Sequence, residues 1–275
     1  MQKIIIPNTD IHTSRLGFGT SSLHHLYSKN KRKKMIYAAL DEGFLYFDTA
    51  RMYGHGMCER SLGEFLPTSW RDDITISTKF GIVANSVYES FPLAMYAGKS
   101  FKKLFKPSFS KVSRDITLNG IMASVSKSLS ALKTNRLDVL MLHEPLSSEI
   151  PLLEHSMEWI LKQKESGRIR YFGLAGEVEQ CMELKRYFGD AIDILQIEDS
   201  ITKKESIAMH DNYPVQITYG YMRRSLGNNT ISPMDALDLG LKQNLEGVVL
   251  VSTRSINRLK EMSKLVKLDG KYNTV

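Results

Sequence analysis

The sequence predicts an α/β protein of the (β/α)8 class, a TIM barrel in which eight parallel strands close into a ring surrounded by helices. Three observations support this fold class. Strand-like and helix-like runs alternate along almost the whole chain, the strand-like runs number eight, and 275 residues suffice for one such barrel. Eight βα units favour a closed barrel over an open parallel sheet. Because no repeat or linker interrupts the chain, we expect residues 1–275 to form a single domain.

The eight expected strands are short apolar runs, several of them almost continuously apolar. Such runs are typical of parallel strands, because helices cover the sheet and leave little of it in contact with water. They occupy residues 15–19, 44–48, 74–79, 137–143, 169–175, 192–198, 214–218 and 247–251. Two shorter runs, residues 3–6 and 11–14, flank the turn-forming residues PNTD and predict an N-terminal β-hairpin.

Helix-like patterns fill the spaces between these strands. In the first of them, Met35, Ile36, Ala39 and Leu40 recur at the spacing of one buried helix face, and the basic run 29–34 is expected to face water. The expected helices are residues 31–42, 58–66, 118–134, 153–166, 178–188, 233–244 and 256–266. Residues 199–212 hold the remaining connection, although their helical pattern is poor.

Two segments are longer than a strand-to-helix connection requires. Residues 82–116 follow the third strand and interleave lysines with aromatic residues, namely Phe91, Tyr96, Phe101, Phe105 and Phe109. Long connections in compact domains are usually either functional or disordered. We therefore expect this one to cover a substrate at the barrel mouth, with a mobile surface loop as the alternative. Residues 220–233, after the seventh strand, predict a second loop at the rim.

Composition and charge limit the classes of partner. With 42% hydrophobic and 24% charged residues the chain has a globular composition, and no apolar run reaches the roughly 18 residues of a membrane span. It lacks a secretory signal and has two cysteines, so we expect reduced thiols and a cytoplasmic location. A net charge of +7 suits a phosphorylated ligand or a solvated surface. We expect no nucleic-acid partner and, from the histidine spacing, no metal site.

Four polar residues stand at or near the ends of predicted strands, where βα barrels carry their active sites. Asp48 and then Tyr53 follow the second strand, Lys79 ends the third and His143 ends the fourth. A tyrosine, whose pKa is ordinarily about 10, can protonate a carbonyl oxygen when an ammonium lowers that pKa and a carboxylate holds the ammonium. Each residue alone has an ordinary structural explanation. Together they predict carbonyl reduction, with the hydride coming from a nicotinamide because no side chain supplies one.

The strings FDTARMYG, STKFG and LMLHEP, in this order, resemble the aldo-keto reductase superfamily, and the similarity runs from residue 16 to residue 261. The resemblance implies that Tyr53 is the general acid in reduction and the general base in oxidation. It implies further that Lys79 lowers the tyrosine pKa, that Asp48 pairs with Lys79, and that His143 orients the substrate oxygen. It also implies a hairpin closing the barrel bottom, and we expect a monomer.

For the cofactor, the resemblance implies an NADPH or NADP site, with NADH or NAD as an alternative. LGFGTSSL lacks the third glycine of the open-sheet dinucleotide fingerprint, so the cofactor is expected to lie extended across the barrel top. The nicotinamide end is matched by Gly19, Thr20, Asp48, Gln196 and Tyr219. Ala175 and Gly176 replace the usual Ser-Asn, so two hydrogen bonds to the carboxamide are lost or come from the backbone.

The adenosine end of the cofactor is matched by the strand and helix in VVLVSTRSINRLKEM. Helix starts favour phosphate, because their backbone N–H groups are free and the helix dipole is positive there. Arginine can also pair with a 2′-phosphate or stack on adenine. The matching residues are Ser252, Thr253, Arg254, Arg258 and Glu261, while Met262 replaces the usual asparagine. A capped helix carrying surface arginines is the alternative explanation of this segment.

The substrate is expected to be a small aldehyde, ketone or sugar held beside Tyr53 and His143. His24 and His25 follow the first strand and are candidates for the pocket wall. The opening LGFGTSSL and the run FDTARMYGHG look most like bacterial aldose dehydrogenases, so sugar oxidation with NAD is the alternative reaction. An alternative of another class is a cofactor-binding regulatory subunit with little turnover, since the superfamily includes such barrels.

Overall fold

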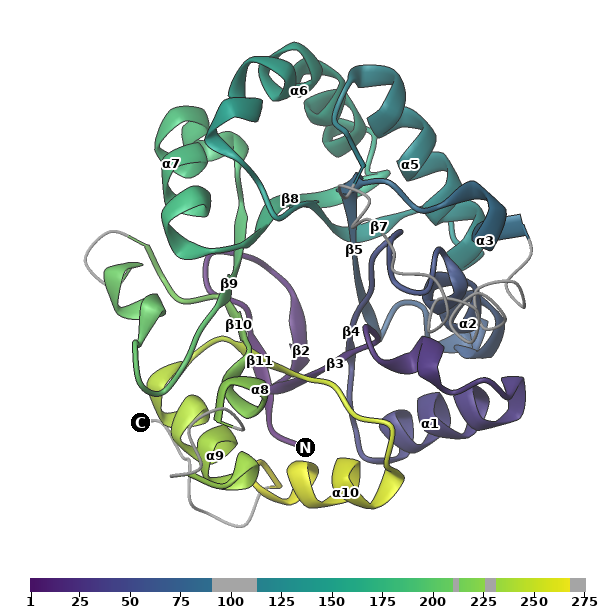
Figure 1. The fold of residues 1–275 in the computed structure, drawn as a ribbon, viewed down its shortest axis with the longest axis vertical. Helices are drawn as coiled ribbons and strands as arrows, with labels where there is room; N and C mark the ends of the chain where they lie inside the picture. Colours follow the sequence, from purple (N-terminus) through teal and green to yellow (C-terminus); the bar gives the residue numbers. More distant parts are fainter. Residues whose placement is uncertain (91–112, 210–212, 226–230, 268–275) are drawn as a thin grey trace, which may run out of the picture.

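Eight parallel strands form a closed ring at the centre of the molecule (Figure 1). The computed structural model describes residues 1–90, 113–209, 213–225 and 231–267. The strands of the ring are β3 (Leu16–Gly19), β4 (Tyr46–Asp48), β5 (Thr75–Ile82), β7 (Leu137–His143), β8 (Ile169–Gly176), β9 (Ile194–Glu198), β10 (Ile217–Tyr219) and β11 (Val248–Val251). Neighbouring strands pair in parallel, and the pairing of β11 with β3 closes the ring. The (β/α)8 barrel predicted from the sequence is confirmed.

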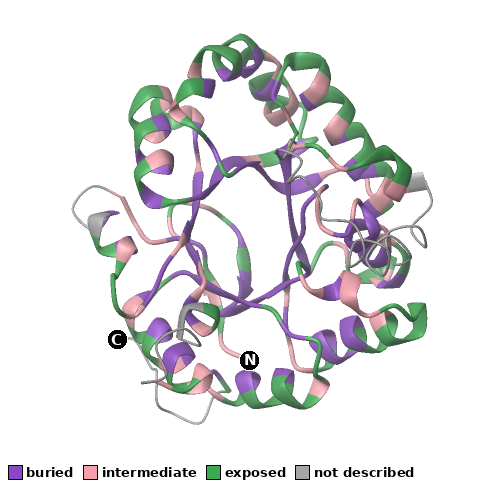
Figure 2. Ribbon diagram, in the orientation of Figure 1, coloured by how far each residue is buried: buried purple, intermediate pink, exposed green. Residues whose placement is uncertain are grey.

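The seven predicted helices surround this ring, and their buried residues face it (Figure 2). They are α1 (Lys29–Asp41), α2 (Met57–Phe65), α5 (Leu118–Leu132), α6 (Ile150–Glu165), α7 (Val178–Phe188), α9 (Pro233–Gln243) and α10 (Ile256–Lys264). Side-chain caps start three of them, because Thr117, Ser232 and Ser255 accept hydrogen bonds from backbone N–H groups of the first turn. In the described part of the connection from β9 to β10, a short 3-10 turn (Glu205–Met209) takes the place of a helix.

Apolar side chains fill the barrel on both sides of its wall. Between strands and helices lie large residues such as Phe18, Phe47 and Phe80. The interior of the ring holds a second cluster, which includes Tyr46 and Met141. Since alternate residues of a strand point to opposite faces, strands such as β4, β7 and β11 supply both clusters.

The bottom of the barrel is closed by the predicted N-terminal hairpin. It consists of β1 (Lys3–Ile5) and β2 (His12–Ser14), which pair antiparallel with Ile4 opposite Thr13. Ile6 and Ile11, at its turn, are buried in the inner cluster together with Val139 of β7. The hairpin therefore covers apolar surface that the amino ends of the strands leave open.

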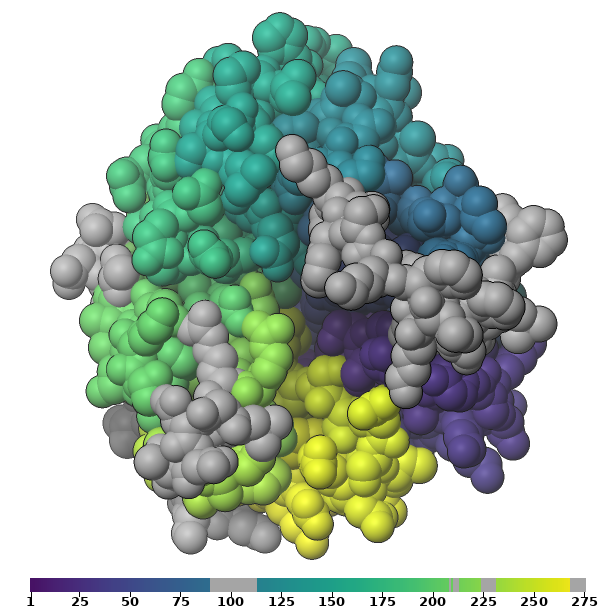
Figure 3. Space-filling view, viewed as in Figure 1, coloured from purple at the N-terminus to yellow at the C-terminus, as the bar shows by residue number. Residues whose placement is uncertain are grey.

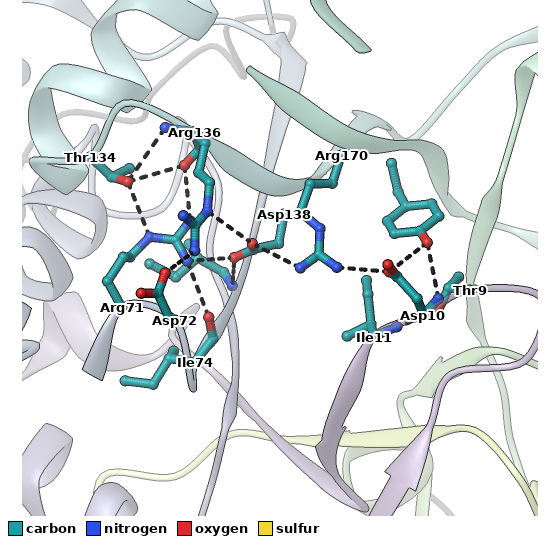
Figure 4. A network of polar contacts seen from close by, with 12 residues as sticks. Thr9, Asp10, Ile11, Arg71, Asp72, Ile74, Thr134, Arg136, Asp138 and Arg170 are labelled. Carbon is teal, nitrogen blue, oxygen red and sulfur yellow. Dashed lines mark hydrogen bonds and ion pairs between the residues drawn. The ribbon is translucent and has the colours of Figure 1, made fainter. Parts of the chain in front are cut away.

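A network of charged side chains ties this hairpin to the barrel (Figure 4). At its centre is Asp138, which is buried near the start of β7 and accepts hydrogen bonds from Arg71 at 2.8 Å and from the backbone N–H of Ile76 at 2.8 Å. Arg170 bridges Asp138 and Asp10 of the hairpin turn, at 3.6 and 2.7 Å. These contacts lie at the amino ends of the strands. Residues at this face of a βα barrel contribute to stability, whereas the active site is at the opposite face.

The long connection after β5 is described only in part. Its near end extends β5 to Ile82 and contains α3 (Ser86–Ser90), and its far end forms β6 (Arg114–Asp115), which pairs antiparallel with β5. Residues 91–112 lie outside the described residues, and so do Phe91, Tyr96, Phe101, Phe105 and Phe109. The expected substrate cover falls on this segment. Of the second expected loop, residues 226–230 are also outside the described part.

Three expectations from composition can be compared with the described residues. Cys58 and Cys181 are buried free thiols. No described helix is both long and apolar enough to cross a membrane, and no described cluster of His, Cys, Asp and Glu could hold a metal ion. In the basic run 29–34 the lysines are exposed as expected, but Arg32 is half-buried and donates to Ser61 Oγ at 3.0 Å.

Candidate active site

The carboxyl ends of the strands surround a cavity of about 360 Å³. Figure 3 shows this face of the molecule, which is hollowed near its middle between the purple, yellow and green segments. The cavity wall includes Asp48, Tyr53, Lys79 and His143, so the four residues predicted from strand ends meet in one place. Each arrives there because parallel strands bring their carboxyl ends to the same side of a barrel.

Asp48 and Lys79 form a buried ion pair at the base of the cavity. Strand register explains why they meet. Asp48 of β4 lies opposite Ser77 of β5, and Lys79, two residues further along β5, points to the same side as Ser77. The Ser77 hydroxyl donates to Asp48 Oδ1 at 3.0 Å, and Lys79 Nζ also donates to the Thr49 carbonyl at 3.0 Å. The ammonium is thus held by two oxygen acceptors.

Tyr53 lies above this pair on the turn that follows β4. The turn is possible because Gly54, His55 and Gly56 all have positive φ angles, of 56°, 51° and 82°. The Tyr53 backbone N–H donates to the Ala50 carbonyl at 3.0 Å. Lys79 Nζ is 5.2 Å from the centre of the Tyr53 ring. The His143 ring meets the same ring edge-on, with 5.7 Å between the ring centres.

The electrostatics of the site follow from burial. Desolvation raises the pKa of Tyr53 well above its ordinary value of 10, and the Asp48 carboxylate raises it further. Desolvation also lowers the pKa of Lys79, although the charge of Asp48 opposes this. Lys79 was expected to lower the tyrosine pKa, but burial and the Asp48 carboxylate raise it. Tyr53 therefore holds its proton tightly at neutral pH.

His143 is the fourth member of this group and is buried at the end of β7. Burial lowers the pKa of His143 well below 6.5, and the positive charges of Lys79 and Arg114 act in the same direction. Its imidazole is therefore neutral near pH 7. A neutral imidazole has one nitrogen that donates a hydrogen bond and one that accepts.

Sequence reasoning missed a buried ion network that supports the Tyr53 turn. Arg51 Nη1 donates to Glu59 Oε2 at 2.6 Å, and Glu59 Oε1 accepts a hydrogen bond from the Thr78 hydroxyl at 2.7 Å. Arg51 also pairs with Glu89 of α3. Because Thr78 precedes Lys79 on β5, the network joins the tyrosine turn to the lysine strand. The nearest sequence signal was Arg51 itself, a charged residue inside the motif FDTARMYG.

The residues matched to the nicotinamide end mostly line the cavity. Gly19, Asp48, Gln196 and Tyr219 lie on its wall, whereas Thr20 is buried and is not part of the wall. Gln196 is only 3% exposed, and its Oε1 has no hydrogen-bond partner among the described residues. An unpaired buried acceptor is unfavourable unless a ligand supplies the donor.

The residues matched to the adenosine end surround the start of α10. Thr253 is buried and its Oγ1 accepts from the Ser255 backbone N–H at 3.1 Å. Arg254, Arg258 and Glu261 are exposed. None of these residues is on the wall of the described cavity, so an extended ligand would have to leave the cavity beside Ser252 to reach them.

His24 and His25 do not line the described cavity, contrary to the expectation. They form a 3-10 turn after β3 with their rings 4.0 Å apart. The backbone of this turn directs His24 against Gly54, where a Cβ atom on the glycine would lie 2.4 Å from the Cβ of His24. His24 thus packs behind the turn that carries Tyr53.

The cavity wall also contains charged residues that sequence reasoning did not select. Glu144 follows His143 directly, and Glu198 ends β9 two residues after Gln196. Glu198 forms an ion pair with Arg223 of α8 (Tyr221–Ser225). Both residues are close in sequence to predicted site residues, and this proximity could have identified them as site candidates.

Fold and site together define a parallel α/β barrel with a buried carboxylate–ammonium pair beneath a tyrosine. The chain belongs to the aldo/keto reductase family, whose model matches residues 15–216. D-threo-aldose 1-dehydrogenase of Pseudomonas sp is 29% identical over 203 residues, which cover 72% of this chain and 60% of that protein. The uncharacterized oxidoreductase YcsN of Bacillus subtilis is 29% identical over 211 residues, which cover 75% of this chain and 64% of that protein. The chain thus spans less than two thirds of the length of these relatives.

Solved structures share the fold over nearly the whole chain. The glycerol dehydrogenase of Gluconobacter oxydans superposes with a TM-score of 0.72 at 20% identity, covering 96% of this chain and 90% of that one. An aldo-keto reductase of Klebsiella pneumoniae, solved in complex with NADPH, gives a TM-score of 0.68 at 18% identity, covering 98% and 92%. At these identities the likeness concerns the fold.

Proposed function

We propose that this protein is an NAD(P)-dependent oxidoreductase that interconverts a small carbonyl compound and its alcohol. The observation that carries the proposal is the position of Tyr53, 5.2 Å above the ammonium that Asp48 holds. The cavity beside it has room for a small substrate. Family membership supports the same class of reaction.

The residues present fit a nicotinamide dinucleotide. The free Gln196 Oε1 offers an acceptor to an amide N–H, and the Tyr219 ring on the same wall offers a surface for stacking. The capped start of α10 beyond Ser252 suits phosphate. When bound, this cofactor supplies or accepts the hydride.

In the proposed reduction, Tyr53 donates its proton to the substrate oxygen as negative charge develops there. The phenol carries its proton at neutral pH, since its pKa lies above 10. The Lys79 ammonium then stabilises the phenolate, and Asp48 keeps Lys79 in place. His143, neutral at the cavity wall, holds the substrate oxygen by a hydrogen bond. In oxidation Tyr53 accepts the proton.

NADPH is the preferred cofactor in this proposal. Arg254 and Arg258 are exposed near the start of α10, and no ion-pair partner for either lies among the described residues. Both guanidinium groups are therefore available to pair with a 2′-phosphate. A related fold was solved with NADPH. Sugar oxidation with NAD is the second candidate, because a relative at 29% identity is named an aldose dehydrogenase.

The proposal is tested by measuring turnover of a panel of aldehydes, ketones and sugars in both directions, with each cofactor. We expect reduction of short aldehydes, with NADPH at lower KM than NADH. Equilibrium titration of both cofactors accompanies the kinetics. Tight cofactor binding without turnover of any carbonyl or alcohol would instead favour a regulatory cofactor-binding protein.

A further inference from the structure

Glu144 is an exposed residue on the wall of the catalytic cavity. It follows His143 at the end of β7 and lines the same cavity as Tyr53. Within residues 1–90, 113–209, 213–225 and 231–267 its carboxylate has neither a hydrogen-bond partner nor an ion-pair partner. Because Glu144 is exposed on the cavity wall, its carboxylate is accessible to a molecule bound beside His143.

Nearby arginines do not pair with Glu144 because other carboxylates engage them. Arg114 donates to both carboxylate oxygens of Glu149, at 2.5 and 2.7 Å. Arg223 pairs with Glu198 across the cavity mouth. Desolvation raises the pKa of the Glu144 carboxyl, and the negative charges of Glu198 and Glu177 raise it further. The positive charges of Arg114 and Arg223 oppose this shift but do not reverse it. Glu144 and Glu198 place two carboxylates on the wall of this cavity.

The backbone of Glu144 is held in an uncommon conformation. Its φ angle is +51°, in the left-handed region that non-glycine residues rarely adopt. Its N–H donates to the Ala175 carbonyl at 2.7 Å. The β8 backbone packs closely against it, since a Cβ atom on Gly176 would lie 3.2 Å from the Cα of Glu144. Strained residues that the surrounding structure fixes in this way cluster at ligand sites.

We propose that Glu144 is a specificity-determining residue, whose carboxylate accepts a hydrogen bond from a hydroxyl group near the reacting carbonyl and disfavours substrates with a carboxylate there. The inference rests on the proposed function. The substrate class is then a neutral hydroxyaldehyde or hydroxyketone, including small sugars. A site built to hydrogen-bond a hydroxyl discriminates strongly against analogues that lack it.

The test compares three aldehydes in the full-length enzyme with NADPH. Glyceraldehyde carries hydroxyl groups, propanal carries none, and succinic semialdehyde carries a carboxylate. In Glu144→Gln, kcat/KM for glyceraldehyde relative to propanal should fall about tenfold or more, and that for succinic semialdehyde relative to propanal should rise. Glu179→Gln, the same change at an exposed position of α7, should leave both ratios as in the wild type. Unchanged ratios in Glu144→Gln would overturn the inference.

A binding experiment tests the role of Glu144 independently of catalysis. If the enzyme turns over no carbonyl, the proposed function fails, but the binding experiment still tests Glu144. Glycerol and malonate, a neutral triol and a dianion of similar size, are titrated against the wild type and Glu144→Gln by calorimetry. The variant should bind malonate more tightly and glycerol more weakly than the wild type. Identical affinities for both ligands, including no detectable binding in either protein, would contradict the assignment. Matching thermal unfolding midpoints show that the variant is folded.

Discussion

Lys79 Nζ is 5.2 Å from the centre of the Tyr53 ring, and the same ammonium forms a buried ion pair with Asp48. The two residues come from different βα units, since Lys79 is on β5 and Tyr53 is on the turn after β4. The ion pair stabilises the charged form of Lys79, which burial alone would disfavour. The phenol of Tyr53 keeps its proton because its pKa is raised. The arrangement provides a proton donor with a cation ready to stabilise its conjugate base.

Replacing Tyr53 by Phe keeps the ring and removes the transferable proton. We expect kcat for aldehyde reduction to fall by at least about a hundredfold, the lower end of what a general acid contributes. The dissociation constant of NADPH, measured by quenching of protein fluorescence, should stay close to the wild-type value. Tyr37→Phe, an exposed tyrosine on α1, is the control. Near-wild-type turnover in Tyr53→Phe would show that another group donates the proton.

Acidification should destabilise the fold through His143. Its pKa is well below 6.5 in the folded state, so the unfolded chain, in which the pKa is about 6.5, binds the proton more readily. The free energy of unfolding should therefore fall as pH drops below about 6.5, by up to about 1.4 kcal/mol per pH unit until the folded-state pKa is reached. Urea unfolding of wild type and His143→Gln at several pH values measures this. A wild type no more sensitive to acid than the variant would contradict the lowered pKa.

The two exposed arginines near the start of α10 should distinguish the cofactors. Replacing Arg254 and Arg258 with Gln is expected to weaken NADPH about tenfold to a hundredfold for each lost contact, because charge-assisted hydrogen bonds to the 2′-phosphate disappear. NADH, which lacks that phosphate, should be affected much less. Arg186→Gln, an exposed arginine of α7, serves as the control. Equal weakening of both cofactors in a titration would assign the arginines a structural role.

The buried ion pair between Arg51 and Glu59 should be sensitive to removal of one partner. Arg51→Met leaves the Glu59 carboxylate, which is fully buried, without its guanidinium, and the free energy of unfolding should fall by about 3–5 kcal/mol. Adding Glu59→Gln should recover part of this loss, since it removes the unpaired charge. Lys162→Met breaks a pair on the surface of α6 and should change stability little. A double variant no more stable than Arg51→Met would argue against this account.

The strands and helices were predictable from the sequence because the barrel wall is buried on both sides. Runs such as residues 137–143 and 178–188 carry their strand or helix signal locally, and β7 and α7 have these same bounds. The ends of β4 and β7 were predictable too, and with them Asp48 and His143, because a polar residue that ends an apolar run can be recognised in the sequence. Lys79 was expected to end its strand, but β5 continues past it to Ile82. Eight such units leave few ways to bury all their apolar faces.

Tertiary structure alone decided how these residues act on one another. The sequence shows that a lysine and a tyrosine are present, but the direction of the Tyr53 pKa depends on desolvation, which exists only once the surrounding strands are packed. His24 follows β3 as predicted, yet the turn directs it against Gly54 rather than into the cavity. Among the described residues Glu144 has no ion-pair partner, and Arg114 and Arg223 pair instead with Glu149 and Glu198. Periodicity along a chain reports which faces are buried, whereas charge interactions depend on distances that the closed barrel sets.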